Sequence, residues 1–96
     1  MKIRIYKKHW DAAKKHQMSN IDYDSLRDCL LGKAIKDTLP DARIEGISFC
    51  HATINGIRYI STDVERTTEL VRQWCYNIPE GRASLPRTIE FKEAGY

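Results

Sequence analysis

The sequence predicts a single α+β domain, in which a mainly antiparallel sheet of three to four strands carries about three helices packed mostly on one face. Three observations support this fold class. An Asn-Gly pair separates two alternating apolar runs in the middle of the chain, apolar residues recur at helical spacing on both sides of it, and short alternating segments lie near both ends. A chain of 96 residues provides one hydrophobic core, so we expect residues 1–96 to form one domain.

The N-terminal part of the chain predicts a strand followed by a short helix. Residues 2–6 alternate apolar and polar side chains, which is typical of a half-buried strand. Residues 6–16, YKKHWDAAKKH, place apolar side chains at helical spacing on one side and lysines on the other. We expect Trp10 to be buried on the apolar side of this helix, and Asp11 to lie among the lysines and weaken their field.

A second, longer helix is predicted over residues 23–38. Asp22 or Asn20 would serve as its N-cap, and Pro40 would stop it because proline cannot continue a helix. Apolar side chains cover more than half of its helical wheel. That wide apolar arc indicates a helix contacted on several sides, at the centre of the core.

The strongest local signal lies in residues 47–61, ISFCHATINGIRYIS. The pair Asn55-Gly56 stands between two alternating runs, which predicts a hairpin with a two-residue type I′ turn. A turn of this kind sets the register of the two strands that it joins. The preceding residues 42–46, ARIEG, form either a short strand or the lead-in to the hairpin.

The C-terminal part predicts a helix and a final strand. Thr62 and Glu65 form a capping box at the start of the helix, and Pro79 ends it. Residues 79–86 are rich in turn-forming residues and predict a loop. Residues 87–93, RTIEFKE, alternate again and predict the closing strand.

Composition disfavours several classes of protein. No apolar run is long enough to cross a membrane, and the first residues lack the apolar stretch of a signal peptide, so we expect a cytoplasmic protein. The cysteines are odd in number and widely spaced, which indicates reduced thiols packed as small hydrophobes rather than a disulfide framework. These cysteines are Cys29, Cys50 and Cys75.

The sequence lacks the residue patterns of catalytic and cofactor sites. Neither of the common glycine-rich phosphate-binding motifs is present. The only adjacent pair among the histidines and cysteines, Cys50 and His51, would point to opposite faces of a strand, so we expect no metal site. No base is expected on the same face as Cys50, and the other two thiols lie on apolar helix stripes. We therefore expect a protein that is not an enzyme and holds no cofactor.

Positive charge is concentrated near the N-terminus. The formal net charge is +3, yet residues 1–16 contain six basic side chains and one acidic side chain. Two interpretations remain open: a solvated helix face, or contacts to the phosphate groups of a nucleic acid. No helix-turn-helix, zinc-finger or RNA-recognition signature accompanies these basic residues. They are Lys2, Arg4, Lys7, Lys8, Lys14 and Lys15.

The hairpin offers a second candidate surface. Because strand residues alternate, His51 and Arg58 would share a face with Phe49 and Ile60, a mixture that is common at protein interfaces. If helices cover only one side of the sheet, that face can receive a partner. In the alternative, Phe49 and Ile60 are core residues on the helix-covered side.

The order of these segments resembles a group of short, uncharacterised proteins encoded by bacteriophages and prophages. The matching pieces are KIRIYKKHWDAA, DCLLGKAIKDTLP, INGIRYISTDVERTTELVRQW and LPRTIEFKE, which together cover most of the chain. In that group a strand, a brief helix, a cysteine-containing apolar helix, a hairpin, a helix and a closing strand follow in the same order. This sequence departs from the group's pattern because it lacks a proline after Cys29 and an acidic segment after the third helix.

The resemblance implies a viral or mobile-element origin, and no functional residue comes with it. Small single-domain proteins from such genomes often bind a host enzyme or defence complex and block it. We therefore expect a non-enzymatic inhibitor that acts by protein–protein interaction, of the anti-defence or anti-CRISPR kind. The alternative is a small nucleic-acid-binding accessory or regulatory protein that uses the basic N-terminal segment. The candidate partner-binding residues are Lys7, Lys8, Lys14, Lys15, His51 and Arg58.

Overall fold

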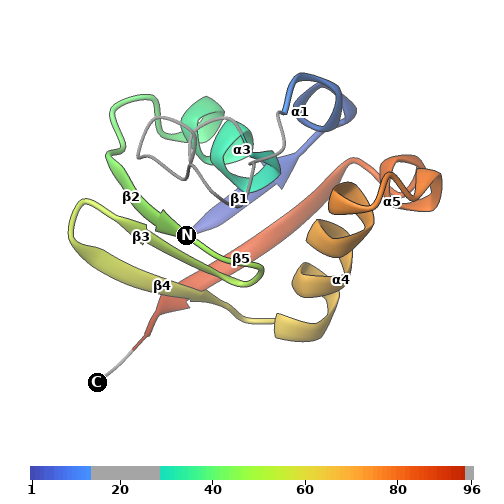
Figure 1. Ribbon diagram of the computed structural model, residues 1–96. Helices are drawn as coiled ribbons and strands as arrows, with labels where there is room; N and C mark the ends of the chain where they lie inside the picture. The colour runs from blue at the N-terminus through green and yellow to red at the C-terminus, as the bar shows by residue number, and fades with distance from the viewer. Residues whose placement is uncertain (14–28, 95–96) are drawn as a thin grey trace, which may run out of the picture.

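Five antiparallel strands form a curled sheet that wraps around a group of helices (Figure 1). The structure, a computed structural model, describes residues 1–13 and 29–94. Within these residues the strand order is β1-β5-β4-β3-β2. The elements, in chain order, are β1 (Lys2–Ile5), α1 (Lys7–Ala12), α3 (Leu30–Thr38), β2 (Ile44–Ile47), β3 (His51–Ile54), β4 (Ile57–Ser61), α4 (Val64–Cys75), α5 (Pro79–Ala83) and β5 (Arg87–Glu93).

The long strand β5 joins the two halves of the sheet. Its first residues pair with β1, where Ile3 lies opposite Ile89, and its last residues pair with β4, where Ser61 lies opposite Phe91. The backbone of Met1 exchanges hydrogen bonds of 3.0 and 2.7 Å with that of Phe91, which extends the pairing of β1 with β5. This arrangement confirms the α+β class and the antiparallel sheet predicted from the sequence.

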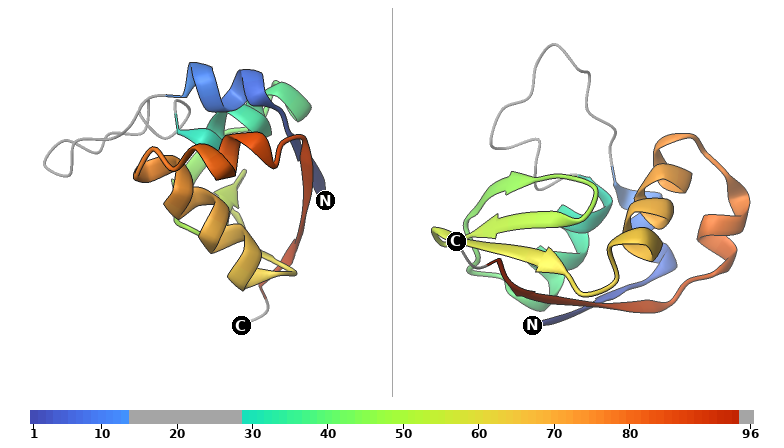
Figure 2. Two further views of the ribbon diagram at one scale, coloured as in Figure 1. Left: turned by 90° about the vertical axis from the view of Figure 1, so that its right-hand side faces the viewer. Right: turned by 90° about the horizontal axis from the view of Figure 1, so that it is seen from below.

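The core lies on one face of the sheet. Side chains alternate between buried and exposed along β1 and along most of β5. The buried ones pack against the apolar faces of α3 and α4, and the left view of Figure 2 shows the helices on the same side of β5. The opposite face of the sheet carries no helix among the described residues. The larger core residues are Ile3, Ile5, Leu30, Leu31, Ile35, Leu70, Trp74 and Phe91.

The hairpin of β3 and β4 forms as predicted. Asn55 and Gly56 have φ values of 51° and 80°, the left-handed backbone that a type I′ turn requires at both of its central positions. The strands leave the turn in register, with Ile54 opposite Ile57. The turn therefore decides which residues of this hairpin point toward the helices and which point away.

Residues 44–47 form an edge strand, so the sheet has five strands where three to four were expected. The side chain of Asn55 accepts a hydrogen bond of 2.8 Å from the backbone N–H of Arg43. The side chain of Glu45 accepts one of 2.6 Å from the N–H of Gly56. These bonds tie the turn to β2, and such a long-range pairing is not visible in the local sequence pattern.

The start of α4 and the segment after this helix differ from the prediction. Asp63, rather than Thr62, is the N-cap: its side chain accepts a hydrogen bond of 3.2 Å from the backbone N–H of Arg66. The N–H of Thr62 instead donates to the carbonyl of Glu90 in the sheet, 2.8 Å away. Pro79 begins the short helix α5 where a loop was expected, because proline suits the first position of a helix. The described residues therefore contain four helices rather than about three.

Helix α1 packs against the core through Trp10 and Ala13, on the side predicted from the sequence, but that side is less deeply buried than expected. Tyr6, one of the apolar side chains expected on that side, is the N-cap and is 40% exposed, whereas the side chain of His9 is only 5% exposed. Trp10 is half-buried and packs at the margin of the core rather than inside it. The helix ends early because Ala13 has an extended backbone, with φ −69° and ψ 141°.

Helix α3 is shorter than the helix predicted over residues 23–38. Cys29 is its N-cap and has an extended backbone, which interrupts a continuous helix at that point. Residues 14–28 lie outside the described part of the chain, and the expected N-caps Asn20 and Asp22 lie among them.

Candidate interaction surface

The face of the sheet that lies opposite the helices presents a mainly basic surface. Its residues are the outward-pointing positions of four strands, and each is exposed or half-buried. We call this surface the open face. Its members are Lys2 and Arg4 of β1, His51 and Thr53 of β3, Arg58 and Ile60 of β4, and Thr88, Glu90 and Lys92 of β5.

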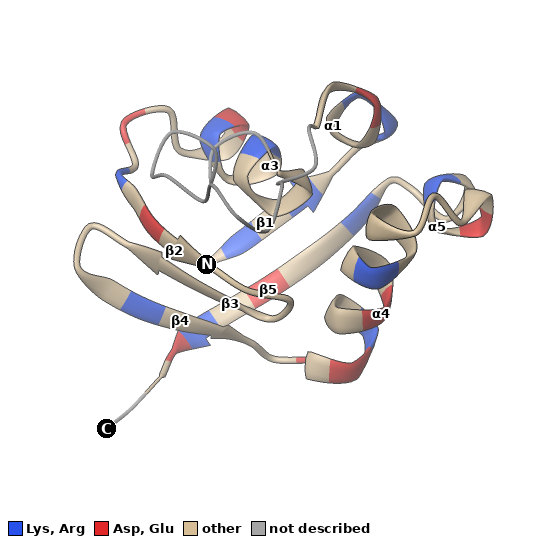
Figure 3. Cartoon of the chain, in the orientation of Figure 1, with Lys and Arg blue, Asp and Glu red and all other residues tan. Residues whose placement is uncertain are grey.

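Four cations of the open face form a continuous row because of the strand register. Lys2 lies opposite Glu90, so Lys92 is its diagonal neighbour on β5. Ile60 lies opposite Lys92, so Arg58 is the diagonal neighbour of Lys92 on β4. Diagonal neighbours are about 7–8 Å apart, and the row continues two residues further along β1. Figure 3 shows Lys and Arg positions on these three strands. The row, which we call the basic band, consists of Arg58, Lys92, Lys2 and Arg4.

The basic band is bordered by one carboxylate and one apolar side chain. Glu90 lies opposite Lys2 and reduces the positive charge at that point. Nη1 of Arg4 donates a hydrogen bond of 3.0 Å to the hydroxyl of Thr88, which holds this guanidinium over the sheet. Ile60 is half-buried on the same face. The open face therefore combines a positive field with a small apolar centre.

The positive charge continues from the basic band onto the start of α1. The ring of Tyr6 is 40% exposed, and Cζ of Arg4 and Nζ of Lys8 each lie 5.6 Å from its centroid. The ring borders a shallow depression of about 450 Å³, which we call the Tyr6 depression. An exposed ring beside cations is an arrangement on which a base can stack while the cations meet phosphate. The Tyr6 depression is lined by Tyr6, Lys7, Lys8, Leu85 and Pro86.

His9 holds α1 against α3, and both of its ring nitrogens are engaged in hydrogen bonds. Its Nδ1 accepts a hydrogen bond of 2.9 Å from the N–H of Tyr6, which leaves the ring proton on Nε2. Nε2 donates to Oδ2 of Asp37 at 3.0 Å, and Nζ of Lys8 lies 3.1 Å from the same oxygen. The hydrogen bonds from His9 and then Lys8 hold the pKa of Asp37 below its usual range.

Trp10 and Asp11 join α1 to α5. The indole of Trp10 covers Gly81 so closely that a Cβ atom there would lie 2.6 Å from the ring. Asp11 accepts two hydrogen bonds of 2.9 Å from the guanidinium of Arg82, and this pairing lowers the pKa of the Asp11 carboxyl. The main partner of Asp11 is therefore on another helix and not among the lysines of its own, as the sequence had suggested.

The residues proposed from the sequence as partner-binding fall into two groups. Lys7 and Lys8 lie at the start of α1, in the Tyr6 depression. His51 and Arg58 lie on the open face, on neighbouring strands. The remaining two residues, which lie outside the described part of the chain, are Lys14 and Lys15.

Phe49 does not share a face with His51, because it lies before β3 begins. It belongs to the turn between β2 and β3 and is 48% exposed. It borders an apolar groove of about 330 Å³ that is also lined by the end of β2 and by residues of α3 and α4. Ile60 stays on the open face, so the four residues expected together are divided between the two sides of the sheet.

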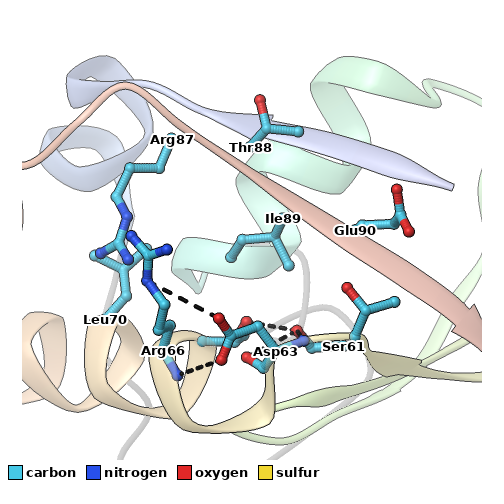
Figure 4. A pocket seen from close by; sticks show the side chains of 10 residues that line it. Ser61, Asp63, Arg66, Leu70, Arg87, Thr88, Ile89 and Glu90 are labelled. Atoms are coloured by element: carbon cyan, nitrogen blue, oxygen red, sulfur yellow. Dashed lines mark hydrogen bonds and ion pairs between the residues drawn. The ribbon is translucent and has the colours of Figure 1, made fainter.

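A polar cleft of about 250 Å³ lies where α4 diverges from β5 (Figure 4). Ile89 points into it, and the guanidinium groups of Arg66 and Arg87 lie at one end. Nε of Arg66 is 4.0 Å from the carboxylate of Asp63. The carboxylate of Asp63 offsets part of this positive charge, whereas the side chains of Thr88 and Glu90 point away from the cleft, toward the open face.

Cys50 and His51 lie within hydrogen-bond distance of each other, contrary to the prediction from strand alternation. Sγ of Cys50 is 3.2 Å from Nδ1 of His51, and Oγ of Ser48 is 3.4 Å from the same nitrogen. The strand β3 starts only at His51, so Cys50 belongs to the preceding turn and alternation does not separate the two side chains. The adjacent cysteine and histidine were visible in the sequence, but the first residue of the strand decides their geometry.

Comparison with known proteins does not show what this surface binds. Comparison with protein-family models, with curated proteins and with solved structures returned no match to this chain. Within residues 1–13 and 29–94, no three potential metal ligands gather at one point, and no helix has the length and apolarity to cross a membrane. The function must therefore be inferred from the geometry of the open face and its surroundings.

Proposed function

We propose that this protein is a non-enzymatic binding module, which attaches to an acidic surface of a protein partner through its open face and thereby inhibits a bacterial host machine. The observation that carries this proposal is the basic band, a continuous row of cations on a sheet face without helices among the described residues. Charge complementarity of this kind accelerates association and disfavours wrong partners.

A protein partner suits the open face better than a nucleic acid does. The band lies beside Ile60 and His51, and mixtures of apolar, ring-bearing and cationic side chains are typical of protein interfaces. None of the described Phe, Tyr or Trp residues lies on the open face, so among the described residues the imidazole of His51 is the one ring available there for stacking with a base. The net charge of +3 and the isoelectric point of about 8.8 are modest for a domain that binds nucleic acid.

The resemblance to phage and prophage proteins supports a bacterial protein as the partner. In this proposal, the protein acts in the host cytoplasm, where it binds to and covers an acidic patch that the target needs for its own interactions. The role requires a rigid surface and no catalytic group. A sheet face whose register is set by five paired strands provides such a surface.

A second candidate function, nucleic-acid binding, is favoured by the Tyr6 depression. There an exposed ring lies between Arg4 and Lys8, and Lys7 adds a further cation. Stacking combined with phosphate contacts gives binding that weakens steeply with salt. Replacement of Tyr6 separates the two candidates, because stacking requires the ring, whereas the open face does not include it.

A charge-matched pair of variants tests the proposed function. The band variant replaces three cations of the open face by glutamine: Lys2, Arg4 and Lys92. The control variant replaces three exposed cations elsewhere by glutamine: Arg43, Arg66 and Arg72. The partner is isolated from a host lysate on immobilised wild-type protein, and its affinity for each variant is measured by calorimetry. We expect the band variant to bind about tenfold more weakly or worse, and the control to stay within about twofold of wild type.

Two outcomes would count against the proposed function. The first is a band variant that binds the purified partner as tightly as the wild type does. The second is the absence of any stoichiometric protein partner, together with salt-sensitive binding of DNA or RNA that Tyr6→Ala abolishes. That second result would establish the nucleic-acid candidate instead.

A further inference from the structure

The three cysteines differ in their surroundings, and Cys50 lies beside an imidazole. Cys29 is buried, its Sγ accepts a hydrogen bond of 3.3 Å from the N–H of Gly32, and burial raises the pKa of its thiol. Cys75 is half-buried and borders the apolar groove. Cys50 is also half-buried, but its Sγ lies 3.2 Å from Nδ1 of His51. A thiol within hydrogen-bond reach of an imidazole has the arrangement of an activated nucleophile.

We propose that Cys50 is a nucleophilic thiol with His51 as its base, and that it is the site at which the protein exchanges with anionic, low-molecular-weight disulfides of the glutathione type. This proposal concerns the chemistry of the chain's own thiol and does not depend on the proposed function. It predicts that one cysteine of the folded protein reacts before the other two.

The exchange needs no reagent besides the disulfide. The neutral ring of His51 carries one proton, and when that proton is on Nε2 the lone pair of Nδ1 accepts the thiol proton of Cys50. The thiolate attacks one sulfur of the disulfide, so that a new S–S bond forms while the old one breaks. The leaving thiolate takes the proton from the imidazolium. Cys50 is oxidised to a mixed disulfide, and the other half of the reagent is reduced to a thiol.

The turn before β3 holds the thiol and the imidazole in place. The carbonyl of Cys50 accepts a hydrogen bond of 2.8 Å from the N–H of Ser61 on β4. The carbonyl of His51 accepts one of 3.0 Å from the N–H of Ser48, which closes the turn. Two backbone hydrogen bonds therefore hold the segment that carries both side chains, one to β4 and one within the turn.

The basic band lies on the same face of the sheet as His51 and selects for an anionic reagent. His51 lies opposite Ile60, and Lys92 follows on the next strand. Arg58 is the diagonal neighbour of His51 on β4. Cations near a nucleophile raise the local concentration of anions, and glutathione disulfide is an anion at neutral pH. The mixed disulfide would also place negative charge beside the basic band; its effect on partner binding rests on the proposed function.

Mass spectrometry of the unmodified, folded protein tests the proposal directly. The protein is incubated with excess glutathione disulfide, and the first adduct is located by peptide mapping. We expect this adduct on Cys50. We also expect glutathione disulfide to react about threefold faster or more than the neutral hydroxyethyl disulfide at low salt, and this preference to shrink at high salt. A first adduct on Cys29 or Cys75, or none on the folded protein, overturns the proposal.

Two further variants test the role of the imidazole. His51→Gln removes the base but keeps a polar side chain, and should lower the rate of the folded protein by about tenfold or more. Ser48→Ala removes the other partner of Nδ1 and should change the rate by less than about twofold. In urea all three proteins should react alike, because the effect of the base requires the folded turn.

An unchanged rate for folded His51→Gln would show that the imidazole is not the base. Thermal unfolding establishes that each variant is folded before its rate is compared. If His51→Gln does not fold, the position of the first adduct on the wild-type protein decides the matter alone.

Discussion

The hairpin of β3 and β4 forms part of the open face and the helix α1 lies next to that face, yet different kinds of interaction hold these two regions in place. The hairpin depends on the backbone of its own turn, where Asn55 and Gly56 both have left-handed φ values. Helix α1 depends on partners that are far away in the sequence: His9 contacts α3, and Asp11 contacts α5. A backbone preference exists before the rest of the chain folds, whereas the contacts of α1 exist only once α3 and α5 are in place.

This difference predicts how each region responds to substitution. A change in the hairpin turn should act mainly through local backbone strain, so its cost should not depend on substitutions in α1. A change in α1 should depend on the partner that it contacts, so pairs of substitutions across that interface should not be additive. The following four experiments test this contrast, from the largest expected effect to the smallest.

Replacing both Asn55 and Gly56 by valine should have the largest effect, about 3 kcal/mol of lost stability, because β-branched residues resist positive φ. The variant also loses the hydrogen bond between the Asn55 side chain and the N–H of Arg43. Urea-induced unfolding measures the change. The exposed neighbouring residue provides a control, since Ile57→Val should change stability by less than about 0.5 kcal/mol. An unchanged urea midpoint for the double variant would contradict the type I′ turn.

Trp10→Ala should cost about 2 kcal/mol, less than the truncation of a fully buried tryptophan, because Trp10 is only half-buried. Its loss also uncovers Gly81 on α5. Urea unfolding measures the cost, and Trp10→Phe, which keeps part of the apolar contact, should recover some of it. If Trp10→Ala behaves like a substitution of an exposed residue, α1 is not docked on α5.

Gly81→Ala should destabilise the protein by about 1–2 kcal/mol through overpacking, although alanine normally favours a helix over glycine. The added Cβ would lie 2.6 Å from the ring of Trp10 and 2.8 Å from Cβ of Gln73. In the Trp10→Ala background the cost should fall, because one of the two clashes disappears. A double-mutant cycle by urea unfolding measures this coupling. Fully additive effects would mean that α1 and α5 do not share this contact.

Asp37→Asn should have the smallest effect, and that effect should depend on pH. The pKa of Asp37 is lowered in the folded protein, so its charge stabilises the fold above the ordinary carboxyl pKa, and this contribution is lost as the pH falls through the lowered value. The variant should therefore be less stable than wild type at neutral pH, and the difference should shrink below about pH 4. Thermal unfolding across this range measures it. A difference of the same size at pH 7 and pH 3 would argue against the ion pair with α1.

Several features of this protein followed from the sequence alone. The turn at Asn55-Gly56 and the alternation of β1 and β5 were predicted at the correct positions. The helix α3 ends before Pro40, as expected. These features depend on allowed dihedral angles and on the two-residue period of a strand, which are properties of a short segment whatever surrounds it. It was therefore easier to predict whether a segment forms a helix or a strand than to predict which other segments it contacts.

Only part of the candidate sites could be predicted from the sequence. The sequence drew attention to Lys7, Lys8, His51 and Arg58, but it did not show that they fall into two groups. It also placed Cys50 and His51 on opposite faces, because the exact start of a strand is not encoded by alternation. A side chain's residue type is visible in a sequence, whereas its distance from another side chain is not.

Tertiary structure decided which residues lie beside one another. The basic band exists because β5 pairs with β1 on one edge and with β4 on the other, in registers that make Lys92 a diagonal neighbour of both Lys2 and Arg58. The side that α1 turns inward was decided by its docking on α3 and α5. Both depend on the free energy of contacts between segments far apart in the chain. That free energy depends on both segments of each contact, so it cannot be predicted from the sequence of one segment alone.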